Sequence, residues 1–361
     1  MNNKSRLEDL RMIDELSNAK GVSGFEDQVV EVIRNHSEGL GEGKEDTLRN
    51  YYLYRKGNTG NRPIVLLDAH SDEVGFMVQS IRANGTLQMI PLGSWVTSNI
   101  PAHKVWVKNS TGEYIPGIVG SKPPHYMSEQ EQKSSLEMRQ LSVDVGARSL
   151  EEAVRVFKMR IGEPIVPYVD FEYNEKQDIM MGKAFDNRLG CAGIISTLKA
   201  LDNEELQVDV VAGFASQEEV GTRGAVVTAR VIKPDIAICF EGCPADDTFL
   251  DSFEAQTAIK KGPMLRHIDA RMITNPRFMR YALELAVRKG IPVQEAVRSM
   301  GSTNGGPIHI SNEGIPTIVI GVPVRYAHTH YGISTYYDYE NSVKLACELL
   351  KVITNDIIKS F

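Results

Sequence analysis

Apolar residues recur at two different spacings along the chain, and the two spacings predict different elements. In residues 6–19 and 26–36 they return every three or four positions, which predicts two amphipathic helices. Residues 62–70 contain a short continuous apolar run, which is typical of a strand covered on both faces. The same reasoning predicts three later strands and four later helices: strands at 207–215, 235–240 and 315–320, and helices near 188–200, 224–232, 276–289 and 339–359.

This alternation predicts an α/β fold with a mixed, mostly parallel sheet and helices on both faces. Residues 73–163 differ, because they consist of short β-type runs separated by turns, with Asn84-Gly85 as a hairpin signal. We therefore expect an α/β domain formed by residues 1–72 and 164–361, interrupted by a β-rich domain at 73–163. Within the insert, residues 121–139 are polar and contain two prolines, which predicts a long surface loop.

The charge balance argues against nucleic acid as a partner. The 361 residues contain 40 Lys and Arg against 47 Asp and Glu, a net charge of −7, so there is no basic excess to neutralise phosphates. Residues 1–20 lack the apolar core of a signal peptide, and no apolar run approaches the ~18 residues of a membrane span. We expect a cytoplasmic protein without a membrane partner.

The cysteines do not indicate a disulfide framework, because there are only four in a long chain. Cys239 and Cys243 are close enough in sequence to suggest a structural zinc site. Since no second pair lies nearby, we favour buried thiols that behave as small hydrophobic residues.

Residues that can bind metal stand at the ends of four predicted strands: His70 and Asp72 after the first, Glu218 and Glu219 after the second, Glu241 after the third and His328 after the fourth. Asp186 lies in a loop just before an apolar helix. Ligands of parallel sheets bind beyond the carboxyl ends of the strands. We therefore expect these side chains to converge.

Each of these residues also has an ordinary structural explanation. His70 alone could be a hydrogen-bonded core histidine, and Asp186 could cap the helix that follows it. Glu219 could pair with Arg223, Glu241 could be a solvated loop residue, and His328 could be merely one of the imidazoles in the stretch His-Thr-His. These explanations do not account for charged groups at four strand ends together, whereas a metal site does.

Imidazole and carboxylate ligands suit zinc, cobalt or manganese. Two such ions ~3.5–4 Å apart share a bridging carboxylate, acidify a water and polarise a carbonyl. His70 and Asp72 are two positions apart on an extended segment, so Asp72 can accept the second imidazole N–H of His70. The same alternation turns Glu218 and Glu219 in opposite directions. We expect Glu219 to bind metal and Glu218 to act as general base and acid.

Six segments carry a family resemblance: GVSGFE (21–26), AHSDEVGF (69–76), GSKPPH (120–125), GKAFDNR (182–188), EEVGTRG (218–224) and RYAH (325–328). In this order they resemble the tetrahedral (TET) or glutamyl aminopeptidase family of two-metal exopeptidases. That family also includes deblocking aminopeptidases and proteins historically called endoglucanases. The resemblance covers nearly the whole chain.

The resemblance implies a zinc-peptidase-like catalytic domain and a β-barrel-like dimerisation domain, with dimers often assembled into a twelve-subunit tetrahedral shell. It implies two divalent ions per subunit, one held by His70 and Glu241, the other by Glu219 and His328, with Asp186 as the bridge. It also implies that residues 121–130 lie near the active-site entrance, within reach of a neighbouring subunit. His125 in that segment is given no role.

Two positions depart from the family pattern. Glu241 stands where aspartate is usual and is one methylene longer, so we expect a different position or affinity for the first ion, although related two-metal peptidases use glutamate there. Asn304 replaces another usual aspartate. We expect that loss of charge to affect substrate selection more than chemistry.

These observations predict a metal-dependent aminopeptidase that acts on peptides with a free N-terminus and works as a homo-oligomer. The alternatives are an N-acyl amino acid deacylase or other amidohydrolase on the same two ions, a glycosidase, and a non-catalytic peptide-binding scaffold. The preferred N-terminal residue stays open, because five basic residues are candidates for a specificity pocket: Lys183, Arg188, Lys260, Lys261 and Arg266.

Overall fold

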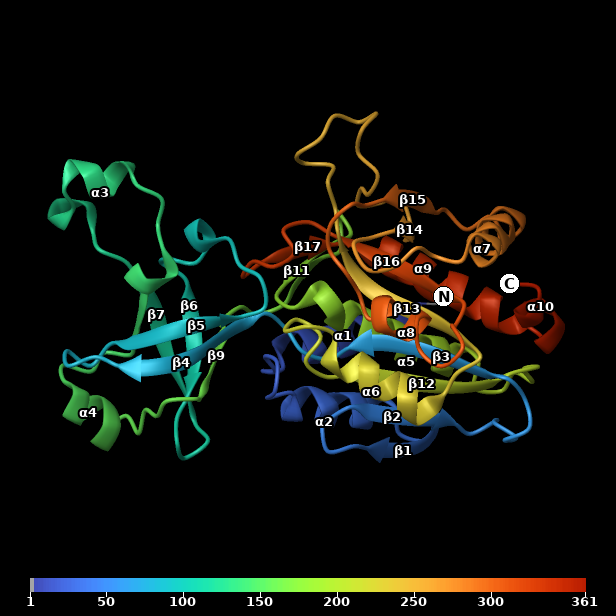
Figure 1. Cartoon of the computed structure of the whole chain (residues 1–361), viewed down its shortest axis with the longest axis horizontal. Helices are drawn as coiled ribbons and strands as arrows, with labels where there is room; N and C mark the ends of the chain where they lie inside the picture. The colour runs from blue at the N-terminus through green and yellow to red at the C-terminus, as the bar shows by residue number, and fades with distance from the viewer. Residues whose placement is uncertain (1–2) are drawn as a thin grey trace.

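The computed structural model describes residues 3–361, which form a helix-flanked sheet with a β-barrel beside it (Figure 1). Within this range the sheet has eight strands, in the order β1 (Gly41–Glu45), β2 (Tyr51–Arg55), β12 (Asp209–Ala215), β3 (Ile64–His70), β13 (Ile236–Pro244), β16 (Thr317–Val324), β14 (Met264–Ile268) and β15 (Gln294–Val297). The four central strands, β12, β3, β13 and β16, are parallel to one another. On one side β2 pairs antiparallel with β12, and on the other side β14 pairs antiparallel with β16. The predicted fold class is confirmed.

Helices cover both faces of the sheet. On one face, the main core contains residues from α1 (Asn3–Asn18), α2 (Asp27–His36), α5 (Phe185–Ala200), α7 (Pro276–Lys289), α9 (Tyr336–Val352) and α10 (Asn355–Lys359). On the other face, a smaller core holds residues from α6 (Arg223–Ile232) and α8 (Gly305–His309). The sheet is therefore buried on both sides, which is why its central strands are continuous apolar runs in the sequence.

Helix boundaries follow local capping chemistry. α7 begins where the Asn275 side chain accepts hydrogen bonds from the first turn, and it ends at Gly290, whose φ of 63° suits glycine. The prediction of one helix over 339–359 was wrong. Ile353 and Thr354 are extended, and the Thr354 hydroxyl caps a separate helix, α10, by accepting the Ile357 N–H.

The closed barrel consists of six strands, in the order β4 (Gly75–Ile81), β5 (Leu87–Leu92), β8 (Ser142–Asp144), β7 (Tyr114–Gly120), β6 (Lys104–Lys108) and β9 (Pro164–Pro167). The hairpin predicted at Asn84-Gly85 joins β4 to β5, and Gly85 has the left-handed φ of 89° that this turn requires. The barrel encloses its own apolar core and carries the short helix α4 (Leu150–Arg155). The domain boundaries drawn from the sequence stay a prediction.

Two smaller features complete the fold. A three-stranded sheet joins β10 (Glu172–Asn174), β11 (Ile179–Gly182) and β17 (Gly332–Ser334) between the barrel and the large sheet. Residues 121–139 lie on the surface of the barrel, as expected, but they contain a helical turn, α3 (Glu129–Lys133), which Ser128 and Glu131 cap reciprocally. Over residues 3–361, none of the helices combines the length and apolar character needed to cross a bilayer.

Candidate metal centre

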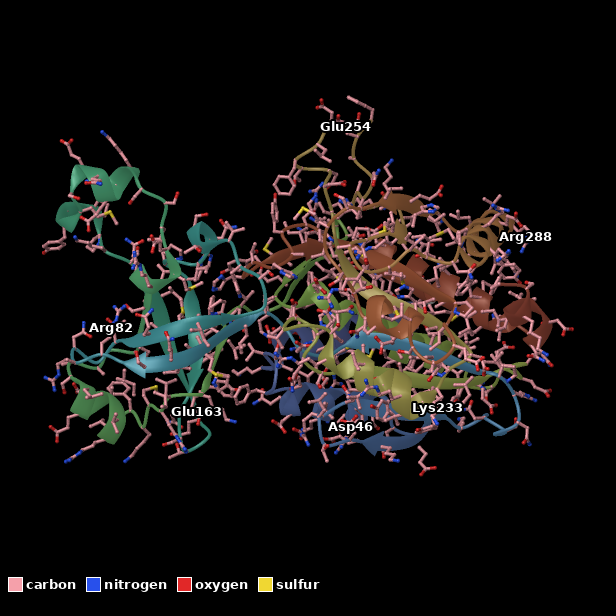
Figure 2. All side chains as sticks on the ribbon, in the orientation of Figure 1. Asp46, Arg82, Glu163, Lys233, Glu254 and Arg288 are labelled. Atoms are coloured by element: carbon pink, nitrogen blue, oxygen red, sulfur yellow. The ribbon has the colours of Figure 1, made fainter. Side chains whose placement is uncertain are left out.

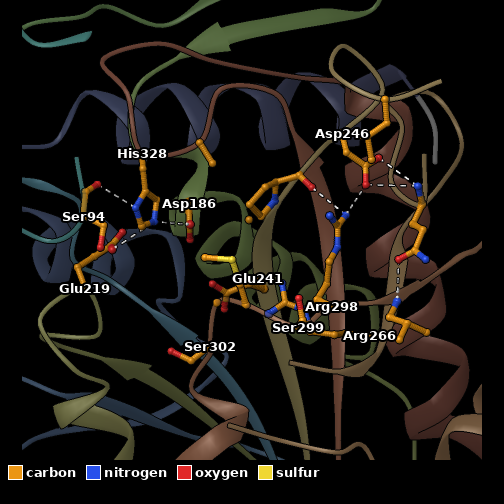
Figure 3. A pocket seen from close by; sticks show the side chains of 18 of the residues that line it. Ser94, Asp186, Glu219, Glu241, Asp246, Arg266, Arg298, Ser299, Ser302 and His328 are labelled. Carbon is orange, nitrogen blue, oxygen red and sulfur yellow. Dashed lines mark hydrogen bonds and ion pairs between the residues drawn. The ribbon is translucent and has the colours of Figure 1, made fainter. Parts of the chain in front are cut away.

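Five side chains from separate segments meet at the carboxyl-end edge of the parallel strands, and Figure 3 labels four of them, Asp186, Glu219, Glu241 and His328. They come from the end of β3, the turn after β12, the interior of β13, the first turn of α5 and the loop after β16: His70, Glu219, Glu241, Asp186 and His328. The structure thus brings together every residue that the resemblance implies as a metal ligand. The Asp186–Asn187 peptide bond is cis.

Asp186 lies between the two histidines. Its Oδ1 is 3.0 Å from Nε2 of His70, and its Oδ2 is 3.5 Å from Nε2 of His328. Each histidine also faces a carboxylate of its own. Glu241 Oε1 lies 3.6 Å from the His70 nitrogen, and Glu219 Oε2 lies 3.4 Å from the His328 nitrogen. Ligand atoms of His70, Asp186 and Glu219 all lie within 4.8 Å of one another, as a metal-binding group requires.

Asp72 lies beneath this cluster and is fully buried. Its Oδ1 is 3.5 Å from Nδ1 of His70, on the ring edge away from Asp186. The same carboxylate accepts hydrogen bonds from the Ser23 hydroxyl (2.6 Å) and from the backbone N–H groups of Glu218 (2.9 Å) and Glu219 (3.1 Å). Asp72 therefore ties the end of β3 to the turn that carries both glutamates.

Glu218 and Glu219 lie in the turn after β12, not on an extended strand. They approach different histidines: Glu218 Oε2 is 3.9 Å from Nε2 of His70, whereas Glu219 faces His328. Within the described residues, the buried Oε1 of Glu219 has no hydrogen-bond partner. A buried carboxylate oxygen without a partner is costly unless a cation or a proton satisfies it.

The ionisation of the cluster reflects its burial. Burial, reinforced by Glu241 and Glu219, raises the pKa of Glu218 well above its ordinary value. Burial likewise raises the pKa of Glu219 to about 8 and that of Glu241 to about 7. For Asp186, the two histidines outweigh burial and hold the carboxyl pKa below its usual range. A bound cation would favour the ionised form of every carboxylate here, so two imidazoles, these carboxylates and the unpartnered Glu219 oxygen fit divalent metal ions.

A cavity of about 690 Å³ opens onto this cluster and extends along β13 and the segment 297–302. Glu254, at the tip of the loop that rises above the sheet in Figure 2, lines its rim. Arg298 and Asp246 form an ion pair of 3.0 Å in its wall. Sequence reasoning missed this pair, because no motif or strand-end position distinguishes either residue.

The five basic residues considered for substrate selection differ in whether they face the cavity. Lys183 and Arg188 are buried and pair with Glu73, at 2.6 Å and 3.1 Å, so they do not face the cavity. Lys260 and Lys261 are exposed outside it. Arg266 alone of the five lines the cavity, and it already pairs with Asp269 at 3.1 Å.

Three further expectations can be compared with the structure. Asn304 is buried away from the cavity, where its amide donates to Asp68 (2.7 Å), so we find no contact through which its missing charge would select substrates. Within the described chain, residues 121–130 do not line the cavity. Cys239 and Cys243 are buried thiols, and the metal-binding group found in residues 3–361 does not include them.

Comparison with known proteins places these observations in a family. The model of the M42 glutamyl aminopeptidase family matches residues 50–345. Glutamyl aminopeptidase of Lactococcus lactis is 31% identical over 325 residues, 90% of each chain. The crystal structure of a TET aminopeptidase from a marine-sediment thaumarchaeote superposes with a TM-score of 0.94 at 34% identity, covering 98% of this chain and 99% of the other.

A third relative adds information on assembly. The TET1 peptidase of Pyrococcus horikoshii, which can assemble into a tetrahedron or a large octahedral shell, is 25% identical with a TM-score of 0.85, covering 96% of this chain and all of the other. The family match spans most of the sequence, and the relatives agree with it in fold over nearly their full length. The chain therefore belongs to the M42 glutamyl aminopeptidase family, and it is an aminopeptidase, a hydrolase of peptide bonds.

Proposed function

We propose that the protein is a two-metal aminopeptidase. In this proposal His70 and Glu241 hold one divalent ion, Glu219 and His328 hold the other, and Asp186 bridges them. The observation that carries it is the Asp186 carboxylate, whose two oxygens face two different imidazoles at 3.0 Å and 3.5 Å. We expect zinc or cobalt, with manganese as a further candidate, because imidazole and carboxylate ligands suit all three.

Two such ions acidify a water and polarise the scissile carbonyl. The role we assign to Glu218 is to take a proton from the attacking water and to give it to the leaving amine. Its carboxylate faces the cavity beside the proposed ligands, and a carboxylate within reach of the attacking water is suited to that proton transfer. Asp72 holds the imidazole of His70 from the opposite ring edge, through its backbone carbonyl at 3.2 Å and its carboxylate at 3.5 Å, and it anchors the glutamate turn.

The substrates we infer are peptides with a free N-terminus, because the carboxylates around the cavity complement a protonated α-amino group. Both arginines in the wall are already ion-paired, so the cavity charge does not assign a preferred side chain. The Pyrococcus horikoshii relative supports assembly into a homo-oligomer, and we propose a dodecamer built from dimers that meet through the barrel domain, residues 73–163. We propose that it acts in the cytoplasm.

The decisive experiment compares Glu218→Gln with Glu284→Gln, a control on the exposed face of α7. We expect Glu218→Gln to lower kcat for aminoacyl p-nitroanilides by ~10²- to 10⁴-fold, with metal content by mass spectrometry unchanged. The control should match the parent. Full activity of Glu218→Gln would refute the general-base role, and faster hydrolysis of N-acetyl amino acids than of aminoacyl substrates would favour a deacylase.

A further inference from the structure

The barrel reaches the metal centre through residues 93–95, the segment that follows β5. The backbone carbonyl of Ser94 lies 3.1 Å from Nδ1 of His328 (Figure 3). A carbonyl can only accept, so Nδ1 carries the hydrogen and Nε2 is free to face Asp186 and Glu219. At Gly93 a Cβ would lie 3.3 Å from Glu219 Oε2, so this backbone approaches both proposed ligands of the second ion.

Aromatic contacts join the same segment to the loop that carries His328. The Trp95 ring stacks on Phe76 of β4 at 4.7 Å, and its Nε1 donates to the Gly75 carbonyl at 3.2 Å. The Trp95 ring also lies 5.2 Å from the ring of His330, two residues beyond His328, at an interplanar angle of 60°. His330 in turn stacks on His103, just before β6, at 4.0 Å and 12°. The His330 ring therefore contacts two aromatic rings of the barrel, one tilted at 60° and one stacked.

His330 contacts its surroundings through the faces of its ring and not through hydrogen bonds. The side chain is 1% exposed, and neither ring nitrogen has a hydrogen-bond partner in the described part of the chain. A buried polar group normally has such a partner. Its packing contacts are thus the interaction that this position provides.

The backbone of the loop needs support from outside. Tyr326 has a φ of 61° and His328 a φ of 60°, in the left-handed region that residues other than glycine rarely adopt. Such conformations persist only where the surroundings fix them. Around His328, those surroundings include the Ser94 carbonyl and the aromatic contacts of His330.

We propose that the barrel positions His328 for the second metal ion through the aromatic cluster of Trp95, His330 and His103. The metal centre is then completed by the barrel of the same chain, and these three side chains are positioning residues that do not touch the ion. The proposal rests on the proposed function only in treating His328 as a ligand.

The test is calorimetric titration of the full-length, chelator-stripped protein with zinc, with His328→Ala defining which ion is the second one. We expect Trp95→Ala and His330→Ala to weaken the binding of that ion by about 10-fold or more. The affinity for the other ion should stay within about threefold of the parent value. His330→Phe keeps the ring without the nitrogens, so it should bind like the parent. Trp106→Ala is the matched control, because it removes a barrel tryptophan that stacks on Tyr168 instead.

Three results would overturn the proposal. Parent-like affinity in both Trp95→Ala and His330→Ala would show that the aromatic cluster does not position the ligand. An equal loss in His330→Phe and His330→Ala would show that the ring nitrogens matter and not the stacking. If His328→Ala binds as many ions as the parent, the ligand assignment itself fails, and this result is distinct from the other two. Should Trp95→Ala not fold, the two His330 variants decide the question.

Discussion

Asp72 contacts three parts of the metal centre at once: the His70 ring, the Ser23 hydroxyl and the backbone of the glutamate turn. Burial alone would raise its pKa, but His70, Ser23 and the N–H of Glu218 lower it, so the carboxylate stays ionised. The spacing in the sequence predicts the contact with His70. The backbone contacts depend on β12 lying beside β3, which no local pattern specifies.

At the residue scale, we predict that Asn304→Asp destabilises the protein. It would place a second carboxyl against Asp68, whose pKa burial already raises to about 7. The two carboxyls can share a proton, and keeping that proton costs more as the pH rises from 6 to 8, because losing it leaves two like charges in a buried site. We expect a loss of roughly 1–3 kcal/mol in unfolding free energy, seen as a drop in Tm that is larger at pH 8 than at pH 6.

The control for this prediction is Asn312→Asp, which makes the same chemical change on an exposed loop. Its melting temperature should match that of the parent at both pH values. A Tm of Asn304→Asp that is equal to that of the parent at pH 8 would contradict the burial argument.

At the element scale, the start of α5 is fixed by ion pairs on both sides of Asp186. Lys183 precedes it and Arg188 follows it, and both bind the buried Glu73, which follows β3. Arg188 also donates to the carbonyls of Leu16 and Gly21. The proposed bridging ligand therefore lies on a segment that is anchored to β3 and to the end of α1.

We predict that Glu73→Gln lowers the free energy of unfolding by roughly 3–5 kcal/mol, because it leaves two buried cations without their partner. The measurement is chemical denaturation followed by circular dichroism. Glu151→Gln, which removes a partner of the exposed Arg155 on α4, serves as the control and should have no measurable effect. Equal stability of the two variants would argue against a stabilising role for the ion pairs.

At the scale of the whole molecule, the buried carboxylates make the stability of the folded protein depend on metal binding and on pH. Glu219 and Glu241 have folded pKa values of about 8 and 7, above those of the unfolded chain. A raised carboxyl pKa contributes stability that is present at low pH and is lost as pH rises through the folded value. Bound cations would remove this loss, because they stabilise the ionised forms.

We therefore predict that chelator treatment abolishes activity and lowers Tm, and that the Tm difference between loaded and metal-free protein widens from pH 6 to pH 8.5. Thermal scanning of both forms across this range is the measurement. Zinc or cobalt should restore Tm and activity together. A Tm difference that narrows with rising pH would mean that the metal does not stabilise the protein by binding the ionised forms of these carboxylates.

The proposed dodecamer makes a prediction of mass. Twelve chains of 40.1 kDa give 12 × 40.1, or about 481 kDa, and a dimer gives 2 × 40.1, or about 80 kDa. Sedimentation equilibrium of the metal-loaded protein should yield the larger value. A single monomeric species at micromolar concentration would refute the oligomer proposal.

Much of the fold could be predicted from the sequence, because apolar spacing reports which face of an element is buried. The helix at 276–289 and the strand at 62–70 have such clear local patterns that the structure places them almost where expected. The pairing of β14 with β15 and the small sheet of β10, β11 and β17 were not anticipated. Their strands are three to five residues long, too short for a periodic signal.

The sequence by itself determined the α/β character of the chain and the residue types at the strand ends, since both depend on local order along the chain. Only the tertiary structure decided which other residues hold the strand-end side chains in place. The Ser94 carbonyl, the His330 stack and the Arg298–Asp246 pair come from segments far apart in sequence, or from groups that give no local signal. Such contacts exist because sheet and barrel pack together, and packing between distant segments has no local pattern from which it could be predicted.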